Sequence, residues 1–210
     1  MRSLKPLTVF ALFCLLLAAA LAVAGCTAAA RGQAGNLKHE DKATTPAISR
    51  APEIDPYDAD AYFKRGRAYQ DKGQYDQAIA DFNRVLEINP NDAEAYLNRG
   101  AAYFGKGQYD QAISDYNRAL EINSWYAEVY NNRGNAYKAK GQYDQAISDY
   151  NRALEIDPQL AMAYYNRAGV YYDRGEYNMA WEDVYRTQSL GGHVDTQFLQ
   201  NLRQASGRWE

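Results

Sequence analysis

The chain has 210 residues, of which 47% are hydrophobic and 23% are charged, and its formal net charge is −3. The length and the apolar content suffice for one compact domain. The acidic excess argues against a nucleic-acid-binding protein, which needs a basic surface, and the two Cys form no pattern typical of a disulfide framework or a zinc site.

The first 25 residues have the pattern of a targeting signal. Arg2 and Lys5 give a positively charged start, Leu7–Ala24 is an apolar run, and small residues end it. The segment Val23–Cys26, with the letters VAGC, resembles the lipobox of bacterial lipoproteins, in which the signal peptide is cut before the Cys and the thiol receives a lipid. The resemblance implies a signal peptide at 1–25 and a lipidated Cys26.

A lipidated Cys26 implies a location in the bacterial cell envelope, anchored in a membrane by the lipid and facing the periplasm. Thr27 rather than Asp follows the Cys, and this favours the outer membrane. One alternative is an uncleaved anchor helix, because an apolar run of about 18 residues nearly spans a bilayer. The other is a plain secreted leader, which would leave Cys26 as an unexplained thiol.

Residues 26–55 join this signal to the rest of the chain. They are rich in Ala, Gly, Thr, Pro and charged residues and show no apolar period, so they are predicted to form a disordered tether. A flexible segment of about 30 residues has a root-mean-square reach of roughly 30 Å. The tether would therefore let a folded domain sit near a membrane without lying on it.

The remainder is organised by an internal repeat. The letters KGQYDQAISDYNRALEI occur at Lys106–Ile122 and again, unchanged, at Lys140–Ile156, 34 residues later. Related versions begin at Lys72 and Arg174. Tyr, Gly and Tyr at spacings i, i+4 and i+7, followed by Ala, an aromatic residue and a small residue at the same spacings, predict one apolar face on each of two consecutive helices. In the second unit these six positions are Tyr96, Gly100, Tyr103, Ala112, Tyr116 and Ala119.

This pattern is similar to that of the tetratricopeptide repeat (TPR) family, whose 34-residue units are helix-turn-helix pairs. The resemblance implies an all-α fold, an α-solenoid of four repeats at 59–92, 93–126, 127–160 and 161–194. After them, Asp195 is a good N-cap, and Phe198, Leu199 and Leu202 form a short apolar stripe. A repeat array needs an end element with one polar face, so 195–210 is predicted to hold a C-terminal capping helix and a tail.

Each unit carries an Arg where the family usually has Leu, and an Asp in the middle of its second helix. By the helical period, both lie at the edge of the apolar stripe, which predicts a partly buried Arg–Asp pair in every unit. The alternative is that Asp115 meets Arg118 at i+3 on an exposed face. The residues are Arg65, Arg99, Arg133 and Arg167 with Asp81, Asp115, Asp149 and Asp183.

The sequence shows no nucleophile–base set, no metal cluster and no phosphate-binding loop. We therefore expect no enzyme activity, no catalytic residue, no metal, no cofactor and no small-molecule substrate. Candidate binding residues lie instead on the open, concave face of the first helices. They are Lys64, Asn98, Asn131, Asn132, Asn135, Asn166, Phe63, Arg67, Phe104, Tyr165 and Tyr172.

Within that set, Asn98, Asn132 and Asn166 recur every 34 residues. The series is similar to the asparagine ladder of some peptide-binding tetratricopeptide superhelices, whose amides hold the backbone of an extended peptide. The alternative is that these Asn side chains are family consensus and merely solvated. Phe63 and Arg67 occupy the surface that a chaperone-type carboxylate clamp would use, so that binding mode is not expected.

The resulting expectation is a membrane-anchored protein–protein interaction scaffold or adaptor that binds a partner peptide or protein on its concave face. One alternative is a structural or pilotin-like part that self-associates or supports a secretion or pilus complex of the envelope. A more distant one is binding of a small molecule or glycan in the aromatic groove.

Overall fold

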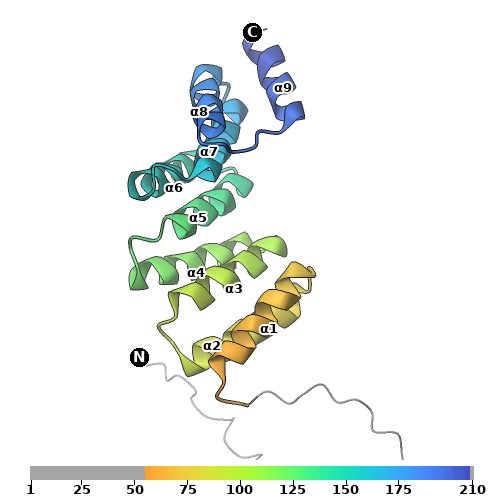
Figure 1. Cartoon of the computed structure of the whole chain (residues 1–210), viewed down its shortest axis with the longest axis vertical. Coiled ribbons are helices and arrows are strands. Elements are labelled where there is room, and N and C mark those ends of the chain that lie inside the picture. Colours follow the sequence, from red (N-terminus) through yellow and green to blue (C-terminus); the bar gives the residue numbers. More distant parts are fainter. Residues whose placement is uncertain (1–54, 209–210) are drawn as a thin grey trace, which may run out of the picture. The chain divides into compact units, whose positions relative to one another are not determined.

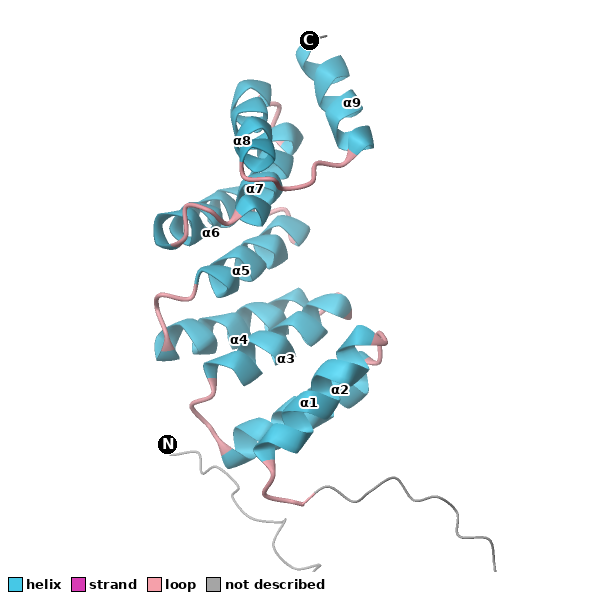
Figure 2. Ribbon diagram, viewed as in Figure 1, coloured by secondary structure: helices cyan, strands magenta, loops and turns pink. Residues whose placement is uncertain are grey.

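The computed structural model describes residues 55–208, and every regular element in that range is an α-helix (Figures 1 and 2). Eight of the helices form four consecutive helix-turn-helix pairs, and a ninth, α9 (Thr196–Ser206), follows them. The pairs are α1 (Ala59–Asp71) with α2 (Tyr75–Ile88), α3 (Ala93–Gly105) with α4 (Tyr109–Ile122), α5 (Ala127–Ala139) with α6 (Tyr143–Ile156), and α7 (Ala161–Asp173) with α8 (Tyr177–Ser189). The predicted all-α solenoid of four repeats and a capping helix is confirmed.

The predicted signal peptide, Cys26 and nearly all of the tether lie outside the described residues. Within 55–208, no helix combines the length and the apolar character needed to cross a membrane.

Each pair turns at a glycine with a left-handed backbone. Gly107, between α3 and α4, has φ 73°, a conformation that costs glycine nothing and strains other residues. Its N–H donates to the Phe104 carbonyl at 2.8 Å, and the Gln108 N–H donates to the Tyr103 carbonyl at 2.9 Å. These two bonds satisfy carbonyls that the end of α3 would otherwise leave unpaired.

A second glycine lets the two helices of a pair approach closely. A Cβ on Gly100 would lie 2.7 Å from Cε1 of Tyr116, well inside contact distance. The Tyr116 ring is 1% exposed and packs among Ala112, Ala119 and Val129. The mid-helix glycine therefore makes room for Tyr116, the largest buried side chain of its cluster, which explains why the sequence accepts its cost to helix stability.

The predicted Arg–Asp pair is present in every unit. Arg99 donates from Nε and Nη2 to the two carboxylate oxygens of Asp115, at 2.8 and 2.6 Å. Arg118 pairs with Glu121 instead, so the alternative pairing with Asp115 is wrong. The same two-point contact joins Arg65 to Asp81, Arg133 to Asp149, and Arg167 to Asp183.

The same guanidinium also joins neighbouring units. Nη1 of Arg99 donates to Asn83 of the preceding unit at 2.7 Å, and Nη1 of Arg133 donates to Asn117 at 2.6 Å. Arg167 makes the equivalent contact with Asn151. We call this three-residue arrangement of Arg, Asp and preceding Asn the Arg clamp. Each clamp Arg also lies against an aromatic ring, such as Arg99 at 5.3 Å from the Tyr96 centroid, which adds a cation–π attraction.

Burial and pairing act in opposite directions on these charges. Hydrogen bonds to Asp115 raise the pKa of the Arg99 guanidinium, so it stays a cation. Burial raises the pKa of the Asp149 carboxyl, and the contact with Arg133 opposes that rise. A buried ion pair of this kind adds little net stability, but an unpaired buried partner is costly.

The closing helix α9 covers the end of the fourth unit. Leu202 is fully buried, and Phe198 and Leu199 pack beside it against the core of that unit. Asp195 caps the helix by accepting from the Phe198 N–H at 2.9 Å. The opposite side of α9 carries exposed amides: Gln197, Gln200, Asn201 and Gln204. An apolar inner face and a polar outer face are what the end of a repeat array requires.

The Arg clamp predicts an asymmetric response to substitution. Arg133→Leu leaves the Asp149 carboxylate buried without its partner and should lower the free energy of unfolding by about 3–5 kcal/mol. The double change Arg133→Leu with Asp149→Leu should recover most of that loss, because paired apolar residues replace paired charges. Urea unfolding of the full chain measures both.

The matched control is Arg118→Leu, which removes an exposed ion pair and should change stability by no more than about 0.5 kcal/mol. Equal losses for Arg133→Leu and Arg118→Leu would show that the clamp has no structural role.

Candidate functional site

The first helices of the four units form the inner side of the array. Helix α3 contacts both α1 and α5, and α5 also contacts α7, although none of these helices are neighbours in the chain. Lateral contact between first helices places them on the concave side of a repeat superhelix. We call the side of α1, α3, α5 and α7 that faces away from the paired second helices the inner face.

The predicted binding residues divide into three groups by exposure. Lys64 and Arg67 on α1 are exposed, whereas Asn98, Asn132, Asn135 and Asn166 are partly exposed. The aromatic members Phe63, Phe104, Tyr165 and Tyr172 are also partly exposed, but each packs against a buried cluster. Phe63, for example, meets the Phe82 ring edge-on at 5.7 Å. These aromatic side chains therefore belong partly to the core and present only part of their surface to the inner face.

Asn131 is the exception, because it is only 2% exposed. The expectation that it lies open to a ligand is wrong. Leu97 holds the same place one unit earlier and is also buried, at 5% exposure. The lateral contact between first helices covers this position, an effect that the period of a single helix does not reveal. Sequence reasoning had one signal for it, namely the leucine at the equivalent position.

Asn131 joins two rungs of the predicted ladder. Its carbonyl oxygen accepts from the Asn166 amide at 2.9 Å, and its own amide donates to the Asn132 carbonyl at 3.2 Å. In a chain of three amides, the central amide donates from its NH2 group to one neighbour and accepts at its carbonyl oxygen from the other. In the direction that these two bonds give, the NH2 group of Asn132 and the carbonyl of Asn166 are the groups that the contact with Asn131 leaves free.

The remaining amides are engaged differently. Asn98 donates to the carbonyl of Glu94 in its own helix at 2.8 Å, which leaves its side-chain carbonyl free. Asn135 accepts from the buried Tyr150 hydroxyl at 2.7 Å, so it serves the core. Along the inner face the free groups thus alternate: acceptor at Asn98, donor at Asn132 and acceptor at Asn166.

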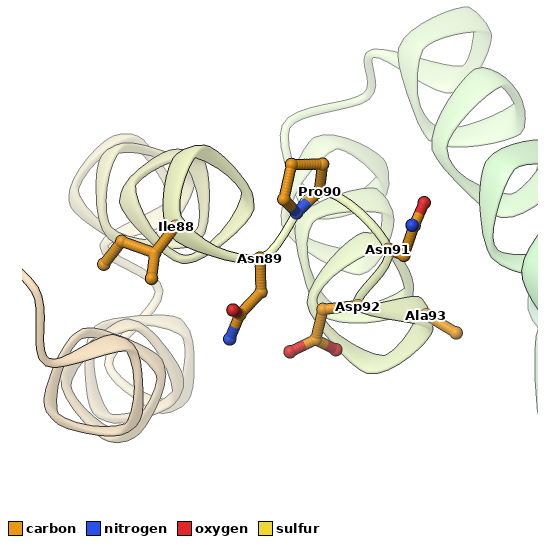
Figure 3. A pocket seen from close by; sticks show the side chains of 6 residues that line it. All are labelled: Ile88, Asn89, Pro90, Asn91, Asp92 and Ala93. Atoms are coloured by element: carbon orange, nitrogen blue, oxygen red, sulfur yellow. The ribbon is translucent and has the colours of Figure 1, made fainter.

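The structure also has a hollow that none of the predicted binding residues line. It has a volume of ≈ 530 Å³, follows the α2–α3 connection and is lined by residues 88–93 (Figure 3). Asp92 in this hollow caps α3 by accepting from the Ala95 N–H at 2.9 Å. The Asp92 carboxylate is therefore already engaged as the N-cap of α3. We interpret the hollow as part of the α2–α3 turn and not as a binding site. Nor do residues 55–208 contain any cluster of His, Cys, Asp and Glu able to hold a metal ion.

Comparison with family models gives three matches, all of them to tetratricopeptide repeat models. They cover residues 49–80 and 91–159, described as tetratricopeptide repeat, and residues 66–107, described as TPR repeat. Comparison with curated proteins gives no match.

Solved structures of the same architecture are numerous. A crystal structure of MamA is 28% identical with a TM-score of 0.60, and the match covers 65% of this chain and 80% of MamA. The first TPR domain of Spaghetti (RPAP3), bound to the HSP90 peptide SRMEEVD, is 29% identical with a TM-score of 0.54, over 57% of this chain and 95% of that domain. The first TPR domain of human RPAP3 is 26% identical with a TM-score of 0.53, over 64% and 98%.

The buried amide at Asn131 can be tested by copying the neighbouring unit. Asn131→Leu should leave the free energy of unfolding within about 1 kcal/mol, because Leu97 shows that leucine fits and only ordinary hydrogen bonds are lost. The side-chain NH2 protons of Asn166 should then exchange faster with water, which NMR detects. Asn131→Asp should be clearly more destabilising, since it buries a charge.

If Asn131→Leu were as destabilising as Asn131→Asp, the amide would hold the units together rather than orient Asn132 and Asn166.

Proposed function

Because the chain belongs to the tetratricopeptide repeat family, we propose that it is a membrane-anchored adaptor that binds an extended segment of a partner protein on its inner face. Arrays of this kind are interaction scaffolds whose concave surfaces receive their partners. The observation that carries the proposal is the row of partly exposed amides on α3, α5 and α7, from Asn98, Asn132 and Asn166.

The chemistry of that row suits a peptide backbone. An extended segment presents N–H and C=O groups in alternation, and the free groups of Asn98, Asn132 and Asn166 also alternate between acceptor and donor. Lys64 continues the register on α1 and adds a positive charge at that end of the row. The peptide-bound RPAP3 domain, one of the similar structures, supports a peptide as the class of ligand.

Self-association by end-to-end stacking fits the described residues less well. The polar outer face of α9 closes the C-terminal end of the array. In addition, Tyr185 stands where Asn83, Asn117 and Asn151 accept from the Arg of the following unit. A second copy docked there would meet a tyrosine in place of the Asn amide that accepts from the Arg in the other units, so we favour the adaptor over a structural stacking role.

The membrane anchor is the second part of the proposal. We place the lipid on Cys26, which directly follows the apolar run and the letters VAG. Two or three acyl chains anchor a protein stably, whereas one is marginal. With a lipidated Cys26 the tether would hold the repeats close to the periplasmic side of a bacterial membrane. Thr27, in place of Asp, favours the outer membrane.

The anchor is checked by mass spectrometry of the N-terminal peptide from membrane extracts. We expect that peptide to begin at Cys26 and to carry diacylglycerol, and we expect Cys26→Ser to release the chain from the membrane fraction. An intact leader, or an unmodified Cys26 in membranes, contradicts the proposal.

The binding groove is checked with a partner segment, first identified by photo-crosslinking from position 132 in cells. Each hydrogen bond contributes about 0.5–1.5 kcal/mol. One Asn→Ala change at Asn98, Asn132 or Asn166 should therefore weaken binding several-fold, and the triple change should remove most of it. Fluorescence anisotropy with the labelled segment measures the dissociation constant, and a melting curve verifies folding.

The matched control is the triple change of Gln77, Gln111 and Gln145 to Ala. These amides recur with the same 34-residue spacing but are exposed on the second helices. Unchanged binding by the folded Asn variant, or equal losses in both triple variants, would show that the Asn row is not the site.

A further inference from the structure

The inner face ends in a pocket at the junction of the fourth unit with α9. Its volume is ≈ 210 Å³, and it is lined by Lys138, Tyr165, Asn166, Gly169, Tyr172, Asp173 and Phe198. These residues come from α5, α7 and the closing helix (Figure 1). Pockets for drug-sized molecules measure roughly 300–1,000 Å³, so this one has the size for a single side chain.

Aromatic rings form one wall of the pocket. Phe198 of α9 meets Tyr165 at 5.7 Å between ring centroids and Tyr172 at 5.6 Å, with interplanar angles of 84° and 66°. Edge-to-face packing of this kind is favourable and fixes the rings in place. Helix α7 supplies two rings of this wall, Tyr165 and Tyr172, and α9 completes it with Phe198.

Gly169 forms the floor. The same place holds Arg67, Ala101 and Asn135 in the first three units, so the fourth unit alone has no side chain there. A Cβ on Gly169 would lie 2.5 Å from Nζ of Lys138. Lys138 thus extends across the space that the missing side chain leaves.

The charges at the pocket are matched. Nζ of Lys138 lies 3.9 Å from a carboxylate oxygen of Asp173, and the two side chains are 35% and 37% exposed. No other charged group lines the pocket. A ligand carboxylate would have to compete with Asp173 for the lysine, whereas an uncharged side chain leaves the pair intact.

Asn166 stands at this pocket and in the amide row at once. Its NH2 group is held by Asn131, so its carbonyl can receive a backbone N–H from a segment whose side chain enters the pocket. We propose that this pocket is the anchor subsite for an aliphatic side chain of the bound segment. Helix α9 then has two roles, closing the array and building the site. This inference rests on the proposed function for its natural ligand.

The pocket can be tested without knowing the partner, using capped amino acids as probes. We would titrate the 15N-labelled full chain with N-acetyl-leucine methylamide, N-acetyl-glutamate methylamide and N-acetyl-glycine methylamide, following the Gly169 backbone amide by NMR. We expect millimolar binding of the leucine probe, at least five-fold tighter than the other two, with chemical-shift changes confined to the lining residues.

A side chain placed at position 169 should abolish the preference for the leucine probe. Gly169→Leu occupies the pocket, and Ala101→Leu places the same side chain at the equivalent position of the second unit as a control. Gly169→Ala is a milder variant that needs only a shift of the flexible Lys138 side chain, and it should weaken the leucine probe about two-fold or more. A third variant, Phe198→Ala, removes the wall and should likewise lower the affinity.

Equal affinity for the leucine and glycine probes overturns the inference, as does leucine binding that survives in folded Gly169→Ala and Phe198→Ala. Preference for the glutamate probe would make this a carboxylate site and overturn the assignment of an aliphatic ligand. The probes are too short to span the amide row and can reach only Asn166 of it. These failures therefore differ from failure of the proposed function, which is measured by the triple Asn variant with the full partner segment.

Discussion

The Arg clamp is the interaction on which the array depends. One guanidinium meets an Asp of its own unit at two points and an Asn of the preceding unit at a third, so one side chain sets both the angle within a pair and the angle between pairs. Arg65, in the first unit, has the contact with Asp81 but within residues 55–208 lacks the contact with a preceding Asn. No unit precedes it among the described residues, and its side chain is 42% exposed, against 19% for Arg99. Polar contacts with fixed geometry specify an arrangement more strictly than apolar packing alone.

The clamp also explains which polar side chains are left free to bind a ligand. Because the Arg, Asp and Asn side chains of the clamp bond to one another between helices, they are not available to a ligand, although they recur in register along the sequence. The groups left free are the amides of the inner face, which repeat with the same spacing because the units do. The repeating units thus place side-chain amides at equal intervals along the inner face. Such a row suits a ligand with evenly spaced hydrogen-bonding groups, such as an extended peptide.

The two ends of that row differ. Among the described residues, the α1 end of the inner face carries Lys64 and Arg67, both exposed. At the other end α9 supplies Phe198, and the row finishes in a small aromatic pocket. A segment lying along the row would therefore meet two exposed cations at one end and, at the other, a pocket with an aromatic wall and a matched ion pair. This difference gives the groove a direction. The charged end and the aromatic end both arise from departures from the repeat, not from the repeat itself.

The amino-acid sequence by itself determined the helices, their pairing, the Arg–Asp contacts and the polar-faced closing helix, because each follows from spacing within one or two units. Only the tertiary structure decided what lateral contact between first helices covers. That contact buried Asn131 and fixed the opposite orientations of Asn132 and Asn166. Packing against α8 and α9 turned Tyr165 and Tyr172 partly into core. The helical period places a residue on a face, but whether that face stays open depends on the neighbouring unit, which no single-helix pattern contains.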